Sequence, residues 1–216
     1  MSKNKKSSFD SSHLSVWHVL DSANAYYEMS LVFTSQVPET LAEIARSTAR
    51  YDLVAASATN RMLALELYFK AVYVAARLPV PKEHDFEVLF DSLPTHHRKA
   101  IESRYDELVE RIPKVGTAWG LEIVFGVGDT VISDAEIKKQ VPYVKFDPSL
   151  PSLLKRNRDG FVASRYLFAL AKPGKITVFQ YEHRQLALLC SVLCEALENS
   201  LDRTQLSYKR NFQFQY

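Results

Sequence analysis

The sequence predicts an all-α protein, a helical bundle with an irregular insertion around residues 113–150. Glycine is scarce, with 6 in 216 residues, and runs that alternate apolar and polar side chains, as half-buried strands do, are few. In several long segments, by contrast, apolar residues recur at intervals of three and four, the period of a helix with a buried face. With 47% hydrophobic and 24% charged residues, the chain can bury a sizeable core.

In the N-terminal half, the expected helices are residues 14–29, 40–50, 51–76, 86–93 and 95–111. Ser11 or Ser12 is the expected N-cap of the first, and Thr95 that of the last. The helix over 51–76 is apolar on nearly every face, which is typical of a central helix packed on several sides. Pro79 ends it, because proline cannot continue a helix.

The C-terminal half begins with the irregular stretch, in which residues 123–125 are expected to form a short strand. Two helices are expected over 151–170 and 182–202, with a short extended piece over 175–180 between them. The organisation predicted for the whole chain is a flexible basic tail over 1–12, one helical domain over 13–204 and a C-terminal tail over 205–216.

The net charge of +2 conceals an uneven distribution. From residue 13 onward, 24 basic and 24 acidic residues balance, yet residues 138–175 contain nine basic residues and only two acidic ones. This balance excludes a uniformly basic nucleic-acid-binding protein but permits a locally basic surface. The alternative interpretation is a solvated basic face that matches an acidic one on a neighbour.

Several protein classes are excluded or disfavoured by simple features. No apolar run approaches the roughly 20 residues of a membrane helix, and the lysine-containing N-terminus lacks the apolar region of a secretory signal. Cys190 and Cys194 lie four apart on an apolar stripe, where buried reduced thiols are simpler than a disulfide or a metal site. We therefore expect a cytoplasmic protein that does not associate with membranes.

The common catalytic and cofactor motifs are absent. The sequence has no G-x-S-x-G elbow and no phosphate-binding G-x-x-x-x-G-K-[ST] loop, and Gly126-Val-Gly128 lacks the third glycine of a dinucleotide motif. The adjacent His96 and His97 would point about 100° apart on a helix and cannot chelate one metal together. We expect no cofactor and no metal.

Polar residues on otherwise apolar helices are the candidates for function. Glu66 and Lys70 have the i, i+4 spacing of a helical ion pair, and their apolar flanks predict that the pair is at least partly buried. Asp85 is placed to accept hydrogen bonds from the first turn of the next helix, with His84 as a capping partner. Arg165 lies among apolar residues and requires an acidic partner or an anionic ligand.

Three short segments carry a family resemblance. Residues 63–71, which include Glu66 and Lys70, and residues 84–90, which begin His84-Asp85-Phe86, resemble the leading helix and the following "HDL" pattern of HEPN domains (higher eukaryotes and prokaryotes nucleotide-binding). Residues 161–166, ending Arg165-Tyr166, resemble the Arg-Tyr motif on a later helix of that family. The resemblance spans roughly residues 50–200. It implies a small helical bundle that forms an antiparallel homodimer and binds nucleotides or RNA.

Some HEPN domains are metal-independent endoribonucleases of toxin–antitoxin and antiphage systems, and these carry an Arg, four to six further residues and a His. In this sequence only Arg77 precedes a histidine, His84, at that distance, and prolines interrupt the segment between them. Arg156-Asn157 begins the motif correctly, but apolar residues occupy the histidine positions. Without an imidazole, no general acid or base is supplied there.

The leading hypothesis is therefore a homodimer that binds RNA, a nucleotide or a protein partner without the standard ribonuclease motif. The residues assigned to ligand or anion binding are Glu66, Lys70, Arg156, Arg158, Arg165 and Tyr166. The first alternative is an endoribonuclease with an atypical catalytic pair, Arg77 and His84. The second is a protein-interaction module, such as an antitoxin or a subunit of a defence complex.

Overall fold

The computed structural model describes residues 8–9, 15–34, 51–112, 121–126, 147–165 and 176–201. This part of the chain is mainly helical, as the sequence predicts. Its helices are α1 Val16–Thr34, α3 Tyr51–Ala75, α4 Phe86–Asp91, α5 Thr95–Val109, α7 Leu150–Arg156, α8 Gly160–Arg165 and α9 His183–Ser200. Its strands are β1 Ser8–Phe9, β2 Val80–Pro81, β3 Leu121–Gly126 and β4 Ile176–Tyr181.

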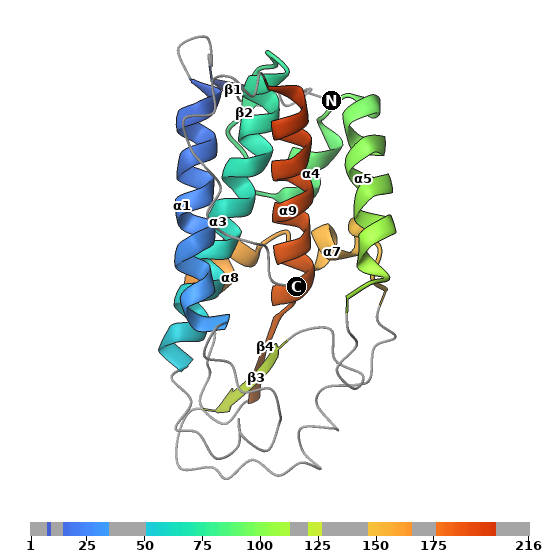
Figure 1. The fold of residues 1–216 in the computed structure, drawn as a ribbon. Helices are drawn as coiled ribbons and strands as arrows, with labels where there is room; N and C mark the ends of the chain where they lie inside the picture. The colour runs from blue at the N-terminus through green and yellow to red at the C-terminus, as the bar shows by residue number, and fades with distance from the viewer. Residues whose placement is uncertain are drawn as a thin grey trace, which may run out of the picture.

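The long helices stand side by side as a bundle, with α3 between α1 and α9, and with α5 against the far side of α9 (Figure 1). The short helix α8 packs against α3, and α7 contacts both α4 and α5. Below the bundle lie β3 and β4, an antiparallel pair in which Leu121 faces Tyr181 and Gly126 faces Ile176 (Figure 1).

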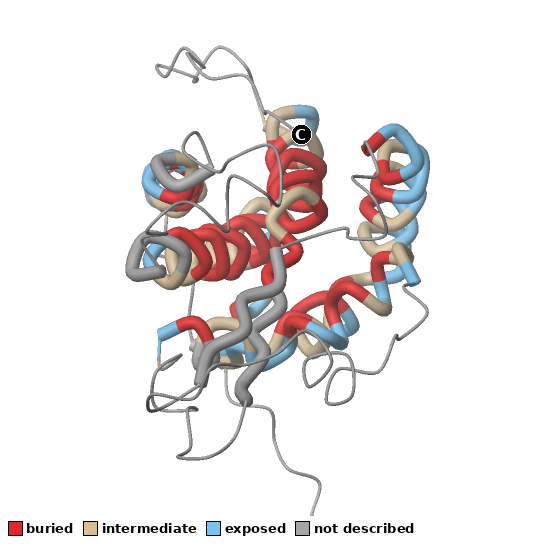
Figure 2. Tube along the Cα trace, turned by 90° about the horizontal axis from the view of Figure 1, so that it is seen from below, coloured by how far each residue is buried: buried red, intermediate tan, exposed pale blue. Residues whose placement is uncertain are grey.

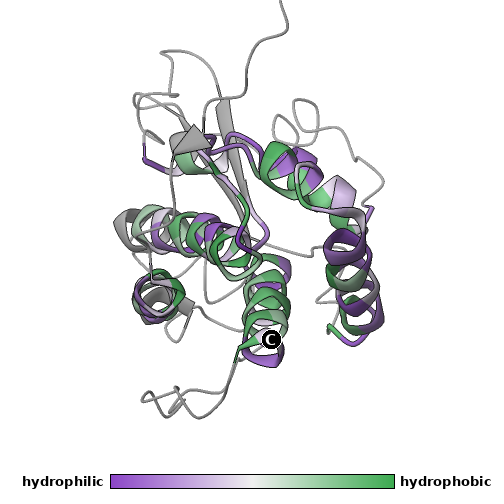
Figure 3. Ribbon diagram, turned by 90° about the horizontal axis from the view of Figure 1, so that it is seen from above, coloured by the Kyte–Doolittle hydropathy of each residue, from purple (hydrophilic) through white to green (hydrophobic). Residues whose placement is uncertain are grey.

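The hydrophobic core is built mainly from α3 and α9, whose residues are buried on most sides, whereas α1 and α5 each expose an outer face (Figure 2). Hydropathy follows the same division, because α9 is mostly hydrophobic and the peripheral α5 is mostly hydrophilic (Figure 3). Aromatic residues of α3 fill the space beneath α4, where Phe69 contacts Phe86 and Phe90. The Tyr73 hydroxyl donates to the Leu89 carbonyl at 2.6 Å, so α4 is also held by a buried hydrogen bond.

Most of the helices expected from periodicity are confirmed, including the long central one over 51–76, observed as α3. The expected strand over 123–125 and the extended piece over 175–180 are both strands, β3 and β4, and they pair with each other. Ser8–Phe9, in the segment expected to be a flexible tail, pairs with Val80–Pro81. Cys190 and Cys194 are buried and not joined in a disulfide, as expected.

The prediction of a continuous helix over 151–170 is wrong within the described residues, because α7 ends at Arg156 and α8 begins at Gly160. The side-chain amide of Asn157 donates to the Leu153 carbonyl at 2.9 Å and to Glu182 at 2.7 Å. Asparagine and glycine are also poor helix formers. The expected cap Thr95 is likewise the first residue of α5, and Pro94 precedes it as N-cap.

Several predictions fall outside the described residues: the caps Ser11 and Ser12, the helix over 40–50, most of the irregular insertion, Tyr166 and the tail over 205–216. In the part of the chain that is described, no helix combines the length and apolar character needed to cross a membrane.

The C-terminal end of α3 has an arginine where glycine is usual. Arg77 adopts the left-handed conformation with φ 54°. Its amide donates to the Val74 carbonyl at 3.0 Å and the Leu78 amide to the Tyr73 carbonyl at 2.8 Å, which together form a Schellman motif. A residue with a Cβ is strained in this conformation, whereas glycine is not.

We expect Arg77→Gly to raise the free energy of unfolding by about 1 kcal/mol, because it relieves this strain. Urea unfolding measures the change. The neighbouring Ala76→Gly is the matched control and should lower stability by about 0.5–1 kcal/mol, since glycine there only adds flexibility to the unfolded chain. A destabilised Arg77→Gly variant would contradict the strain.

Candidate functional site

A buried carboxylate on α3, that of Glu66, bridges two basic side chains. Its Oε1 accepts a hydrogen bond from Lys70 Nζ at 2.6 Å, and its Oε2 lies 2.9 Å from His84 Nδ1. The Glu66 side chain is only 5% exposed and that of Lys70 14%, whereas His84 is 61% exposed. The predicted burial of the Glu66–Lys70 pair is therefore observed, and the pair extends to the protein surface through His84.

The chain reversal after α3 brings His84 to Glu66. After the Schellman motif, β2 leads into α4, whose N-cap is Asp85. Asp85 Oδ1 accepts from the amides of Glu87 at 2.9 Å and Val88 at 3.3 Å, so the expected cap is confirmed. The sequence suggested that His84 is a capping partner. It is not, because its ring turns back to Glu66 instead.

The hydrogen bond to Glu66 determines the tautomer of His84. A carboxylate can only accept, so the shared hydrogen lies on Nδ1 of the imidazole. In the neutral ring Nε2 is then an acceptor, and the large exposure of the side chain makes it accessible to a ligand. A histidine oriented by a buried carboxylate in this way is equipped for proton transfer at Nε2.

The short helix α8 completes the site. The Phe161 ring stacks on His84 with centroids 6.1 Å apart and planes inclined by 22°. The Arg165 guanidinium lies over the same Phe161 ring, 5.0 Å from its centroid. Arg158, which is 54% exposed, approaches Asp85 Oδ2 at 3.9 Å and Asp159 at 3.6 Å. We call this group the His84 cluster: Glu66, Lys70, His84, Asp85, Arg158, Phe161 and Arg165.

Of the residues assigned from the sequence, the cluster therefore unites Glu66, Lys70, His84, Arg158 and Arg165. Arg77 is not joined to His84 by any hydrogen bond or ion pair among the described residues, and its backbone terminates α3. Tyr166 lies outside the described residues.

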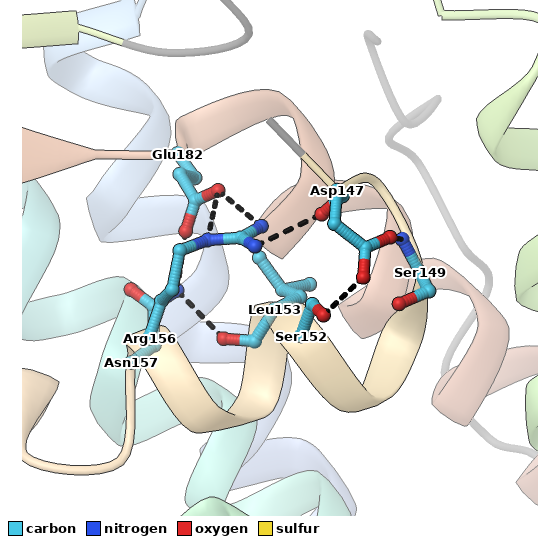
Figure 4. A network of polar contacts seen from close by, with 7 residues as sticks. All are labelled: Asp147, Ser149, Ser152, Leu153, Arg156, Asn157 and Glu182. Atoms are coloured by element: carbon cyan, nitrogen blue, oxygen red, sulfur yellow. Dashed lines mark hydrogen bonds and ion pairs between the residues drawn. The ribbon is translucent and has the colours of Figure 1, made fainter. Parts of the chain in front are cut away.

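Arg156 makes its contacts elsewhere, with the N-cap of α9 (Figure 4). Its Nε and Nη2 donate to Glu182 Oε1 at 3.0 and 2.7 Å, and its Nη1 donates to the Asp147 carbonyl at 2.9 Å. Because the Glu182 side chain is only 8% exposed, this ion pair fastens α7 to the start of α9. The guanidinium is thus engaged in contacts within the protein, away from the His84 cluster.

Two further residues, which the sequence did not assign to a site, have contacts that matter to the structure. Phe161 joins His84 to Arg165, and its i, i+4 spacing from Arg165 was the available signal. Arg61 is completely buried on α3. Like Glu66, it is a charged residue on a helix that is apolar on nearly every face, and this was the available signal.

The described residues include no group of three or more His, Cys, Asp or Glu side chains arranged to hold a metal ion. Comparison with protein-family models, with curated proteins and with solved structures finds no match to this chain. The HEPN resemblance therefore stays a prediction.

We expect Glu66→Met to lower the free energy of unfolding by about 3 kcal/mol, because it leaves the Lys70 ammonium in a nearly closed environment without its carboxylate. The double variant Glu66→Met, Lys70→Met should be more stable than Glu66→Met alone by at least about 1 kcal/mol, since no charge is then left behind. Urea unfolding of both variants measures the difference. A double variant less stable than Glu66→Met would contradict the buried ion pair.

Proposed function

We propose that the chain binds single-stranded RNA or a nucleotide at the His84 cluster. The observation that supports this proposal is the convergence, on one surface, of two exposed arginines with an exposed imidazole and a phenyl ring. Arginine forks match phosphate oxygens, and flat rings stack on bases. A protein that binds a nucleotide through both its phosphate and its base needs groups of both kinds.

The contacts that the arginines make within the protein can be exchanged for contacts with a phosphate. Arg158 is more than half exposed, and its carboxylate contacts are long, at 3.6 and 3.9 Å. Exposed ion pairs of this kind contribute little to stability, so a phosphate oxygen that makes short charge-assisted bonds can replace them. Arg165 is exposed on the last turn of α8.

The charges of the cluster also limit how strong the binding is. Lys70 is paired with Glu66, and the neighbouring Asp85 and Asp159 offset part of the arginine charge. With about two phosphates contacted, the slope of log K against log salt for single-stranded RNA should be roughly −1.4. Much of the affinity should then come from stacking on the exposed face of the His84 ring.

Arg158→Ala and Arg165→Ala should each weaken the binding of a short single-stranded RNA about tenfold, because each removes a guanidinium–phosphate contact. Fluorescence anisotropy over a salt series measures both the affinity and its slope. Arg111→Ala is the matched control: this arginine of the α5 end is 68% exposed and paired with Glu107, and its loss should leave binding unchanged. Equal effects of all three variants, or no binding by the wild type, would refute the site.

An endoribonuclease is the second candidate function, favoured by the hydrogen bond between His84 Nδ1 and Glu66. That bond orients the ring and leaves Nε2 free to take the proton of a ribose 2′-hydroxyl or, when protonated, to give a proton to a leaving oxygen. Arg158 and Arg165 would then stabilise the charge that develops on phosphorus-bound oxygen. The atypical pair Arg77 and His84 is the sequence-based version of this candidate.

If the chain cleaves RNA, His84→Ala should lower the cleavage rate at least about 100-fold, because the proton-transfer group is lost. Digestion of a labelled single-stranded RNA under metal-free conditions measures the rate. Arg77→Gly distinguishes the two versions, since it removes the guanidinium without weakening the fold. Full activity in Arg77→Gly restricts the site to the His84 cluster, and an RNA pool left intact by the wild type rules out both versions.

The homodimer that the resemblance implies, and the protein partner that the hypotheses from the sequence include, remain predictions.

A further inference from the structure

The guanidinium of Arg61 lies in the interior of the bundle, between α1, α3 and the start of α9. The residue is 0% exposed. Its Nε donates to Ser30 Oγ at 2.7 Å, its Nη1 lies 3.4 Å from the His183 carbonyl oxygen, and its Cζ lies 4.5 Å above the Tyr27 ring. These contacts hold the group in one orientation.

The contacts of Arg61 within the described residues include no carboxylate. The groups that surround it electrostatically are tyrosines, a thiol and an imidazole. Burial raises the pKa of the Cys190 thiol to about 12 and raises that of Tyr181, whereas burial, with the charges of Arg184 and Arg61, lowers the pKa of His183 to about 4. All three are neutral near pH 7, while an arginine side chain remains cationic.

One nitrogen of this guanidinium also makes no hydrogen bond within the described part of the chain. Arg61 Nη2 is buried and has no hydrogen-bond partner among the described residues. A buried charge without a counter-charge is strongly unfavourable, and so is a buried donor without an acceptor. The Arg61 guanidinium has both deficits. A bound anion would remove both at once, whereas a water molecule would remove only the second.

We propose that Arg61 holds a small inorganic anion of chloride size at Nη2 inside the bundle. The complete burial of Arg61 argues for a monatomic ion rather than a nucleotide phosphate. Hydroxyl groups of the same network are at hand, since Ser57 Oγ donates to the Ser30 carbonyl at 2.6 Å and lies 3.3 Å from the Tyr181 hydroxyl. This anion site is separate from the His84 cluster and does not depend on the proposed function.

Thermal unfolding in sodium chloride against sodium gluconate at equal ionic strength tests the site, because gluconate is too large to enter. We expect the Tm to rise by about 3–5 °C for each tenfold increase in chloride above its dissociation constant, and to stay constant in gluconate. Arg61→Met should abolish the chloride dependence. The exposed-arginine variant Arg111→Met should retain it.

A wild-type Tm that is equal in the two salts would overturn the proposal, as would a chloride dependence that persists in Arg61→Met. If Arg61→Met does not fold, crystals of the full chain grown in sodium bromide decide the matter. An anomalous bromide peak within hydrogen-bonding distance of Arg61 Nη2 supports the site, and its absence there overturns it.

Discussion

The central helix α3 is covered along most of its length, so every polar side chain on it must find its partner inside the protein. Ser57 does so against α1, Arg61 does so in part, through Nε and Nη1, against α1 and the start of α9, and Glu66 does so against Lys70 and His84. A buried polar group that is left unsatisfied costs free energy. The placement of α1, of the α9 N-terminus and of the loop before α4 therefore follows from demands made by one helix.

At Glu66, the need for a hydrogen-bond partner also creates the candidate site. Glu66 is deep enough to need two donors, and the second donor is a histidine at the surface. The left-handed Arg77, the β2 segment and the Asp85 cap together direct the chain so that His84 reaches back 18 residues to Glu66. A residue that satisfies a buried carboxylate and also faces solvent is held rigidly, as a binding or proton-transfer group requires.

The interruption between α7 and α8 has a comparable effect on the basic segment of the chain. Glu182 binds Arg156 and Asn157, which ends α7 and fixes its end against α9. A Cβ on Gly160, the first residue of α8, would come within 3.0 Å of the Met62 side chain, so α8 can approach α3 closely there. Phe161 then stacks on His84, and the Arg165 guanidinium lies over the Phe161 ring. Two arginines two residues apart, Arg156 and Arg158, thus differ in their contacts: Arg156 makes a short ion pair with Glu182 at 2.7 Å, whereas the carboxylate contacts of Arg158 are long, at 3.6 and 3.9 Å.

Local pattern was sufficient for the features whose partners are near in the chain: the long helices, from their apolar period, the Asp85 cap, and the i, i+4 pair of Glu66 and Lys70. It was insufficient wherever the partner is distant. The bond from His84 to Glu66, the capture of Arg156 by Glu182 and the burial of Arg61 among neutral groups each join segments 18 or more residues apart. Periodicity reports which face of a helix is buried but not what that face meets. Only packing brings the partners together, because a charge that leaves water must be compensated by whatever the fold places beside it.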